Sequence, residues 1–484
     1  MKTVNQFSQV AGIDRRSFLS GAFAAFGGLV LPVDAFGEPG TPLVRIGVAS
    51  DVHIDSMPDA IRLWAKALAW FDREKVDVVM VPGDIAHSGV IASHERFAAE
   101  YDRVFPNGRG SDGRPVERVF VTGNHDIGGW GGRWDKHSLE EQRLTRFDFE
   151  DNPKKTWERL YHEEWKLISK KTVKGITFVS AQYQSLNPPV KEFFSQHAKT
   201  FDPALPFFYT QHAHPTGTCH GSYCSVHDHG LTGETLSRFP NAVAITGHTH
   251  CSLTDERAVW QDAFTSIGAG CLAGGVELKS AYANAGAFYR RNCKCAMMPV
   301  IEKSPLCSNA LLVDVYADHL IVRRRSVHFE EDLGEAWSVP LPAAKAGPMD
   351  FARRAAQRAA PAFAADAVMR TEYMPKGHAL ASRRLKGKPV VAVSFPPARS
   401  VRGCRVFDYQ LSATADGKEV AATGLWPKGF AVPESRVPSL GDELCLFDAA
   451  TLPRGVPVEF SVVPRECFGA SGKPLRSAPL ELPC

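Results

Sequence analysis

From about residue 42, the chain alternates between short apolar runs and stretches whose apolar residues recur with helical spacing. A short apolar run bounded by polar residues is typical of a buried strand, whereas apolar residues three and four positions apart indicate a helix. Strands that alternate with helices predict a layered α/β domain. The predicted strands are 44–50, 76–81, 117–121, 175–180, 207–210, 243–246, 310–316 and 319–327, and the predicted helices are 60–71 and about 93–104.

Five of the predicted strands lead into polar clusters that contain Asp, Asn or His. In α/β sheets, ligands bind beyond the carboxyl ends of the strands, where loops from different strands converge. The five clusters are therefore expected to meet at one place. In chain order they are Asp51-Val52-His53, Gly83-Asp84, Gly123-Asn124-His125, His212 and Gly247-His248-Thr249-His250.

The C-terminal part of the sequence differs in character from the part before residue 330. Residues 331–385 are predicted to be a helical or linker segment, because 351–370 is rich in Ala and Arg and is interrupted by Pro361. From residue 386 to 484, short alternating segments recur between Pro and Gly turns, which predicts a small all-β sandwich like an immunoglobulin or fibronectin III domain. The α/β domain is expected to span 42–330.

The composition is typical of a globular protein, with 44% hydrophobic and 23% charged residues. A length of 484 residues favours two folded units. The formal net charge of +3 is slight, so neither nucleic acid nor an anionic membrane is expected as a partner. Seven of the 17 histidines fall between residues 212 and 250. Because neutral imidazole is the commonest metal ligand, this concentration indicates a metal site.

The N-terminus resembles a twin-arginine export signal. Arg15 and Arg16 are followed by a weakly apolar run over 18–31, which is too short to span a bilayer comfortably. We therefore predict a signal peptide over 1–35, export through the twin-arginine translocase, and a periplasmic or secreted location. The alternative is a buried N-terminal helix that carries the two arginines. No later stretch predicts a membrane span.

The 11 cysteines fit an exported protein, in which disulfides are permitted. Cys219 and Cys224 are close enough to clip the loop that carries several histidines. Cys404, Cys445 and Cys467 fall in the C-terminal region together with Cys484. The pairing is left open.

The five polar clusters, in their order and content, resemble the signature of the calcineurin-like metallophosphoesterases over roughly residues 43–270. The resemblance implies two metal ions. It assigns Asp51, His53 and His250 to one ion. It assigns Asn124, His212 and His248 to the other. Asp84 would bridge the two ions, and His125 would be the catalytic residue that faces the phosphate.

The residue types suit this chemistry, because carboxylate, amide and imidazole ligands favour Fe, Mn or Zn. Two such ions lower the pKa of a bridging water and neutralise charge on the phosphoryl group, so that a bridging hydroxide acts as the nucleophile. The Asp-x-His motif at Asp51 departs from the Asp-x-Gly of purple acid phosphatases, so an iron bound by tyrosinate is not expected.

A second departure concerns His87, which occupies the position where relatives carry a carboxylate or amide that orients the catalytic His. Asp126 or a residue from another loop is expected to orient His125 instead. His87 and His214 are the candidates for substrate contacts.

Together these features predict an exported dinuclear-metal hydrolase of a small phosphate ester, either a phosphomonoester or a phosphodiester. The alternative is a catalytically weak metal-containing binding protein whose C-terminal sandwich attaches it to a surface.

Overall fold

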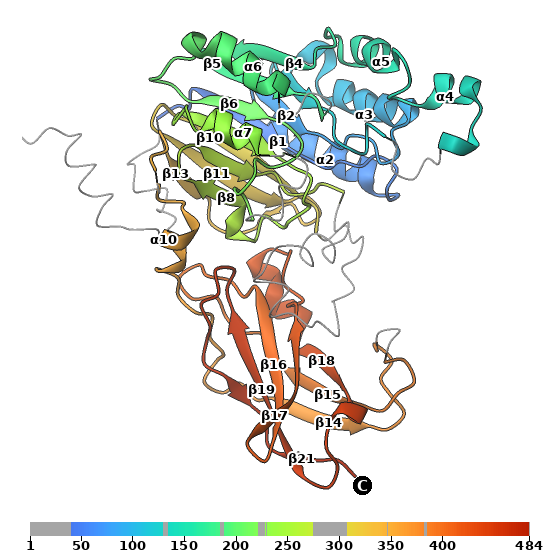
Figure 1. Cartoon of the computed structure of the whole chain (residues 1–484), viewed down its shortest axis with the longest axis vertical. Helices are drawn as coiled ribbons and strands as arrows, with labels where there is room; N and C mark the ends of the chain where they lie inside the picture. Colours follow the sequence, from blue (N-terminus) through green and yellow to red (C-terminus); the bar gives the residue numbers. More distant parts are fainter. Residues whose placement is uncertain are drawn as a thin grey trace, which may run out of the picture.

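The computed structural model describes residues 40–128, 134–183, 188–220, 228, 230–273, 307–345, 347–381 and 385–483. The predicted signal peptide lies outside these residues. The described chain forms two parts along its long axis, and the short helix α10 (Phe351–Ala355) lies at their junction (Figure 1). None of the helices in the described ranges has the length and apolar character needed to cross a bilayer.

The N-terminal part contains two sheets. The first has the strand order β12-β11-β10-β1-β2-β3, with β13 on β11, and only the pairs β1–β2 and β2–β3 are parallel. Its strands are β1 Val44–Val48, β2 Val78–Pro82, β3 Glu117–Val121, β10 Asn309–Val315, β11 His319–Ser326, β12 Glu331–Asp332 and β13 Trp337–Pro340.

The second sheet has the order β4-β5-β6-β7-β9-β8, in which the four central strands are parallel. Its strands are β4 Ile168–Val173, β5 Ile176–Ala181, β6 Phe207–Thr210, β7 Ala242–Thr246, β8 Val259–Gln261 and β9 Thr265–Gly268. The helices of this part are α2 Ala60–Arg73, α3 Ile91–Val104, α4 Leu139–Thr145, α5 Asn152–Tyr161, α6 Pro188–His197 and α7 Leu231–Leu236.

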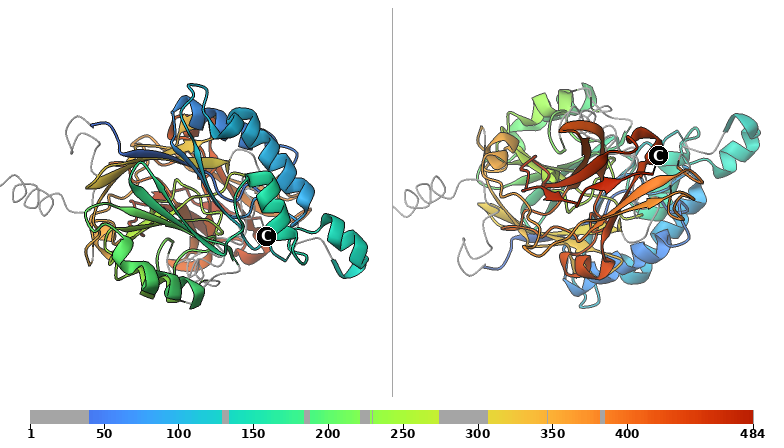
Figure 2. Two further views of the ribbon diagram at one scale, coloured as in Figure 1. Left: turned by 90° about the horizontal axis from the view of Figure 1, so that it is seen from above. Right: turned by 90° about the horizontal axis from the view of Figure 1, so that it is seen from below.

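The period-two alternation of side chains along each strand produces four layers. In β2, Met80 joins a core between the two sheets that also contains Phe208 of β6. Val79 and Val81 point the other way and pack with residues of α2, α3 and α5. On the far side, Tyr209 packs with residues of α6 and α7. The helices therefore lie outside a pair of stacked sheets (Figure 2), and the predicted layered α/β fold is confirmed.

The C-terminal part consists of antiparallel strands that share one core. One sheet is β14-β15-β18, and the other is β17-β16-β19-β20 with β21 on β19. The two sheets pack face to face, as expected of a sandwich. The strands are β14 Arg370–Met374, β15 Val390–Phe395, β16 Asp408–Ala415, β17 Lys418–Leu425, β18 Glu443–Asp448, β19 Pro457–Arg465, β20 Leu475–Arg476 and β21 Leu480–Glu481.

Strand pairing adds detail to the expected helical or linker segment over 331–385. Its first strands, β12 and β13, pair with β11, whereas β14 pairs with β15 of the C-terminal part. Between them α10 is the only α-helix among the described residues, and Asp350 caps it by accepting the main-chain N–H of Arg353. Ala362, directly after Pro361, instead forms an antiparallel bridge with Arg399.

The described cysteines are buried, and no disulfide joins any two of them. Cys219 has its expected partner Cys224 outside the described residues, so the predicted clip stays a prediction. In the C-terminal part, Cys404, Cys445 and Cys467 are buried thiols.

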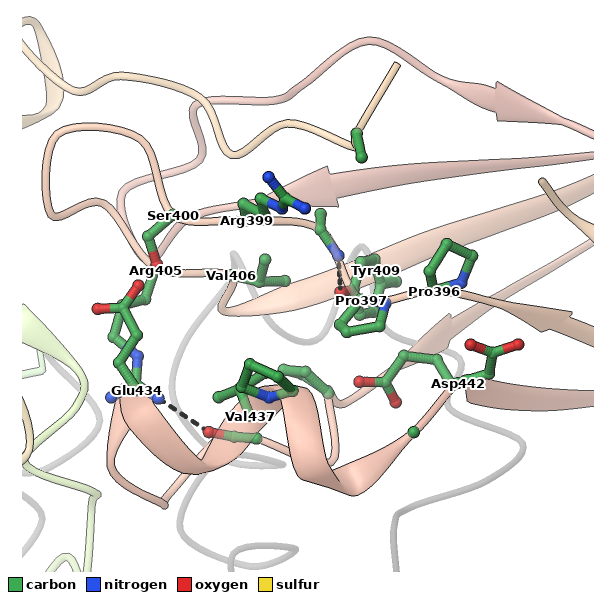
Figure 3. Close-up of a pocket in the computed structure, with 17 residues that line it drawn as sticks. Pro396, Pro397, Arg399, Ser400, Arg405, Val406, Tyr409, Glu434, Val437 and Asp442 are labelled. Carbon is green, nitrogen blue, oxygen red and sulfur yellow. Dashed lines mark hydrogen bonds between the residues drawn. The ribbon is translucent and has the colours of Figure 1, made fainter. Parts of the chain in front are cut away.

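A pocket of about 680 Å³ opens in the C-terminal part, with Tyr409 and Asp442 among its lining residues (Figure 3). Glu443 also lines it and is only 2% exposed. Burial raises the pKa of Glu443 to about 7, although its carboxylate accepts the main-chain N–H of Lys428 at 3.1 Å. The folded chain therefore holds a proton on Glu443 well above the ordinary pKa of 4.5.

This raised pKa predicts a pH dependence of stability. Between pH 4.5 and about 7 the folded state keeps the proton and the unfolded state loses it, so stability falls as the pH rises through this window. The loss is on the order of 3 kcal/mol. Glu443→Gln is expected to remove it. In urea unfolding at several pH values, the free energy of unfolding of the variant should rise relative to that of the wild type as the pH increases to about 7. A difference between the two proteins that does not depend on pH would contradict the assignment.

Candidate metal centre

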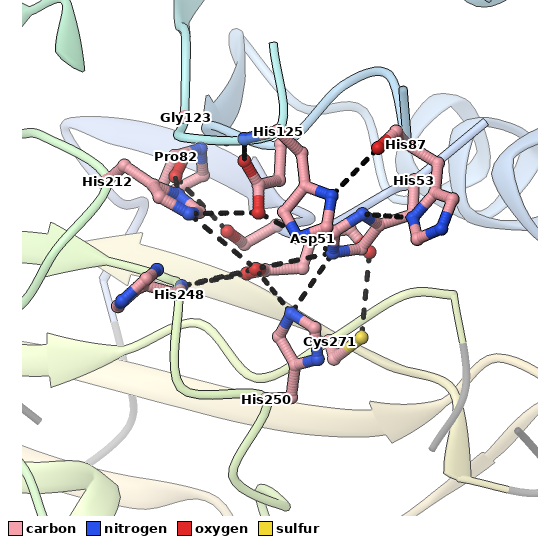
Figure 4. A network of polar contacts seen from close by, with 12 residues as sticks. Asp51, His53, Pro82, His87, Gly123, His125, His212, His248, His250 and Cys271 are labelled. Carbon is pink, nitrogen blue, oxygen red and sulfur yellow. Dashed lines mark hydrogen bonds and ion pairs between the residues drawn. The ribbon is translucent and has the colours of Figure 1, made fainter. Parts of the chain in front are cut away.

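The five polar clusters meet at one edge of the stacked sheets, as the strand ends predict (Figure 4). Asp51 and His53 follow β1, Asp84 follows β2, and His125 follows β3. From the second sheet, His212 follows β6, while His248 and His250 follow β7. The main chain ties these loops together, because Asp51 N–H donates to the Gly83 carbonyl at 3.1 Å and Gly247 N–H donates to that of His212 at 2.9 Å.

Four side chains place potential ligand atoms within 4.8 Å of one another, namely Asp51, His53, Asp84 and His250. His250 Nε2 lies 2.9 Å from Asp51 Oδ1 and 3.0 Å from His53 Nε2. His53 Nε2 lies 3.5 Å from Asp84 Oδ2. These are the residues that the sequence assigns to the first ion, together with the expected bridging residue.

The second expected set approaches the same carboxylate from the other sheet. His212 Nε2 lies 3.1 Å from Asp84 Oδ2, and the His212 and His248 ring centroids are 4.9 Å apart. Asn124 Oδ1 is buried and has no hydrogen-bond partner within the described part of the chain. Buried polar atoms without partners are rare and call for an explanation such as a bound ion.

The opposite nitrogen of His212 is fixed by a main-chain acceptor. His212 Nδ1 donates to the Pro82 carbonyl at 2.7 Å, which leaves Nε2 as the unprotonated nitrogen of the neutral ring. Such a hydrogen bond on the second nitrogen is usual for histidines that bind metal, because it fixes both tautomer and ring orientation. The local geometry of His212 therefore fits a metal ligand.

The backbone of the predicted ligands is strained. Five of them have positive φ in the left-handed region, which costs on the order of 1–3 kcal/mol for each residue and is concentrated at functional sites. They are Asp51 (53°), His53 (43°), Asp84 (53°), His248 (73°) and His250 (52°).

Two glycines let the loops approach closely enough to form the cluster. A Cβ atom on Gly123 would lie 2.1 Å from Asp84 Oδ1. A Cβ atom on Gly247 would lie 1.9 Å from Ser50 Oγ and 2.5 Å from Asp51 Oδ2. Any larger residue would push the carboxylates out of place, so the glycine in each motif has a steric reason.

The two buried carboxylates are balanced by imidazoles. Burial opposes ionisation of Asp51, but His250 and His212 outweigh it and hold its pKa at about 2. Burial likewise opposes protonation of His212, yet Asp84 raises its pKa to about 9. Without an ion, protons thus supply the positive charge that the carboxylates need. A bound cation would take over that role and release the proton from His212.

The structure shows a main-chain atom that orients His125. His125 Nδ1 hydrogen-bonds to the His87 carbonyl at 2.8 Å, and His125 N–H donates to Asp84 Oδ1 at 2.9 Å. Of the two expected alternatives, Asp126 or a residue from another loop, the contact comes from the other loop and not from Asp126. Asp126 is fully buried and instead accepts main-chain N–H groups, with Ala86 at 2.7 Å and Gly123 at 2.8 Å, so it joins the loops after β2 and β3.

The two candidates for substrate contacts lie in different surroundings. His87 Nδ1 is 3.4 Å from His53 Nδ1, beside the ring nitrogen of His53 that faces away from Asp84. His214 is buried, hydrogen-bonds to Thr246 Oγ1 and lies 3.1 Å from Thr249 Oγ1. His214 therefore supports the loop after β7 from behind, and a substrate contact for either residue stays a prediction.

Two further residues beside the site were not expected from the sequence. The Tyr183 ring centroid, just after β5, lies 6.3 Å from that of His212. Cys271 Sγ lies 3.6 Å from the Asp51 carbonyl oxygen, to which it donates (Figure 4). For Tyr183 the available signal was its place after a predicted strand, which it shares with the five clusters. For Cys271 the sequence holds no comparable signal.

Residues 44–252 match the family model described as calcineurin-like phosphoesterase. This stretch includes all the predicted ligands and His125. This match supports a calcineurin-like phosphoesterase domain over residues 44–252. No curated protein sequence matches the chain.

Several solved structures resemble the chain distantly. A dimetal phosphatase from Danio rerio is 14% identical, covers 62% of this chain and 99% of its own, and has a TM-score of 0.36. The purple acid phosphatase PPD1 from yellow lupin is 12% identical, covers 61% and 53%, and has a TM-score of 0.39. The GAP50 anchor of the Plasmodium inner membrane complex is 13% identical, covers 62% and 89%, and has a TM-score of 0.37. Likenesses this distant carry no inference about activity.

The contacts of His87 predict separate effects on metal affinity and turnover. His87→Ala removes the imidazole beside His53 but keeps the main-chain carbonyl that orients His125. Loss of such a supporting group lowers metal affinity about 10- to 100-fold. We expect that loss in chelator-competition titrations, with turnover at saturating metal changed less than about fivefold.

The matched control for this variant is His137→Ala, which removes an exposed histidine from the turn just before α4. It should leave both quantities unchanged. Unaltered metal affinity in His87→Ala, or collapse of its turnover at saturating metal, would contradict the assignment.

Proposed function

We propose that the protein is an exported, dinuclear-metal phosphoesterase that hydrolyses a small phosphomonoester or phosphodiester. The observation that carries the proposal is the position of one buried oxygen, Asp84 Oδ2. It lies 3.5 Å from His53 Nε2 and 3.1 Å from His212 Nε2, so it faces both expected ligand sets at once. A carboxylate in that position is what a shared ligand requires.

The residues present fit two ions. One would be held by Asp51, His53 and His250, whose ligand atoms already cluster with Asp84. The other would be held by Asn124, His212 and His248, and it would give a partner to Asn124 Oδ1. Oxygen and imidazole donors without a thiolate suit Fe, Mn or Zn. When bound, the two ions supply Lewis acidity, lowering the pKa of a water between them and neutralising charge on the phosphoryl group.

The chain's own contribution to the reaction centres on His125. Its Nδ1 is held by the His87 carbonyl, so Nε2 is the nitrogen directed away from the supporting loop. From this position it would hydrogen-bond to the phosphoryl group or protonate the leaving oxygen. His125 is also tied to Asp84 through its main-chain N–H, so the proton donor and the shared ligand keep a fixed relation.

Export and location are part of the proposal and rest on the twin-arginine pattern at Arg15 and Arg16. The proposed route is the twin-arginine translocase, which would deliver the folded protein to the periplasm or the medium. A binding protein without turnover is disfavoured, because all seven expected ligands and His125 are present.

The proposed activity predicts that a variant can lose turnover and still bind metal. Purified protein should hydrolyse p-nitrophenyl phosphate or its bis-ester with Mn²⁺ and stop when a chelator is added. His125→Ala should lower kcat about 10²- to 10⁴-fold, the usual range for loss of a general acid, with metal content nearly unchanged. Metal analysis and kinetics on the same sample test this, and loss of metal in His125→Ala would show that its role is wrong.

A further inference from the structure

Buried and half-buried arginines join the N-terminal and C-terminal parts. Arg358 Nη1 lies 2.7 Å from Glu256 Oε2, which belongs to the N-terminal part. Arg358 Nε donates at 3.1 Å to Glu466 Oε2, which belongs to the C-terminal part. From the C-terminal side, Arg405 NH1 donates to the Leu333 carbonyl at 3.0 Å. The junction is therefore a polar, charged interface and not a flexible tether.

A cavity of about 250 Å³ lies within this interface, and four arginines line it. Arg324 comes from the N-terminal part, Arg358 from the segment between the two parts, and Arg402 and Arg405 from the C-terminal part. The cavity shares no lining residue with the candidate metal centre. Arg405 also borders the neighbouring pocket in Figure 3, so it separates the two hollows.

The carboxylates that line the cavity do not balance these arginines. Glu256 is already paired with Arg354 at 3.2 Å and with Arg358. Glu335 and Glu434 are exposed. Across the described ranges, no carboxylate lies within 4 Å of the guanidinium group of Arg324 or Arg405. Neither arginine thus has a carboxylate in direct contact, which is costly for the buried charge of Arg324.

Arg324 shows this lack of a contacting carboxylate most directly. Its side chain is buried. Nη1 donates to the Leu253 carbonyl at 2.9 Å, and Nη2 donates to the Glu335 carbonyl at 2.7 Å. The guanidinium carbon lies 4.3 Å from the centroid of the Trp337 ring. Its Nε has no hydrogen-bond partner among the residues that the structure describes. Burial lowers the pKa of Arg324 to about 10; nearby Glu256 opposes this shift, and Arg405 and Arg354 add to it. The side chain remains charged at neutral pH.

We propose that this interdomain cavity is a binding site for a small tetrahedral oxyanion of the phosphate type. Guanidinium groups offer forked N–H donors that match phosphate oxygens in geometry and charge. Arg324 Nε would gain a partner, and the anion would contact both parts of the chain. Its binding would stabilise their arrangement, because a ligand of the folded state raises the free energy of unfolding. The site is independent of the proposed phosphoesterase activity.

Arg402→Gln tests the site without disturbing the junction. Arg402 is exposed, and its guanidinium forms no ion pair or side-chain hydrogen bond in the described structure, unlike Arg324 and Arg405. Thermal unfolding and calorimetry with inorganic phosphate, at constant ionic strength, should show stabilisation of the wild type and an affinity at least about tenfold weaker in Arg402→Gln. The matched control is Arg399→Gln, an exposed arginine that lines only the neighbouring pocket and should bind phosphate like the wild type.

Phosphate bound at the metal centre is distinguished from phosphate bound in the interdomain cavity by repeating the titration with Asp84→Ala. Stabilisation by phosphate should persist in this variant. Glycerol 1-phosphate forms a parallel titration: tighter binding of the ester identifies an organic phosphate as the ligand, and tighter binding of phosphate identifies the free ion. Equal phosphate affinity in Arg402→Gln and wild type would overturn the proposal. So would loss of the stabilisation in Asp84→Ala.

Discussion

The buried carboxylate of Asp84 is the constraint on which the site depends. It lies between imidazoles from two different sheets, with His53 on one side and His212 on the other. Its second oxygen accepts the His125 N–H. A buried charge is stable only when it is paired and hydrogen-bonded, so the surrounding loops must converge on this one group. Gly123 makes that convergence possible, because any Cβ there would collide with the carboxylate.

The surrounding fold stabilises the strained backbone at this site. Five of the seven predicted ligands adopt left-handed backbone conformations, which persist only when the surrounding structure determines them. Two stacked sheets with a shared apolar core hold the strand ends in place, and Asp126 joins the loops after β2 and β3 through main-chain hydrogen bonds. Behind the loop after β7, His214 contacts both Thr246 and Thr249. Rigid strands and supported loops together position the ligands.

Most of this fold, and the convergence of the five clusters, could be predicted from sequence because both depend on apolar runs that end in polar groups. The orientation of His125 could not, since a main-chain carbonyl leaves no signature in the sequence at His87. The same limit applies to the junction. Arg358 pairs with Glu256 and Glu466, about a hundred residues away on either side, and no local pattern records such contacts. The short edge strands β4 and β8 also carried no distinct apolar signal.

The most direct test of a dinuclear centre is anomalous X-ray diffraction from crystals of the Mn²⁺-loaded protein. We expect two ions, one on each side of Asp84. One would lie among Asp51, His53 and His250, and the other beside His212. A single ion, or ions bound away from Asp84, would contradict this expectation.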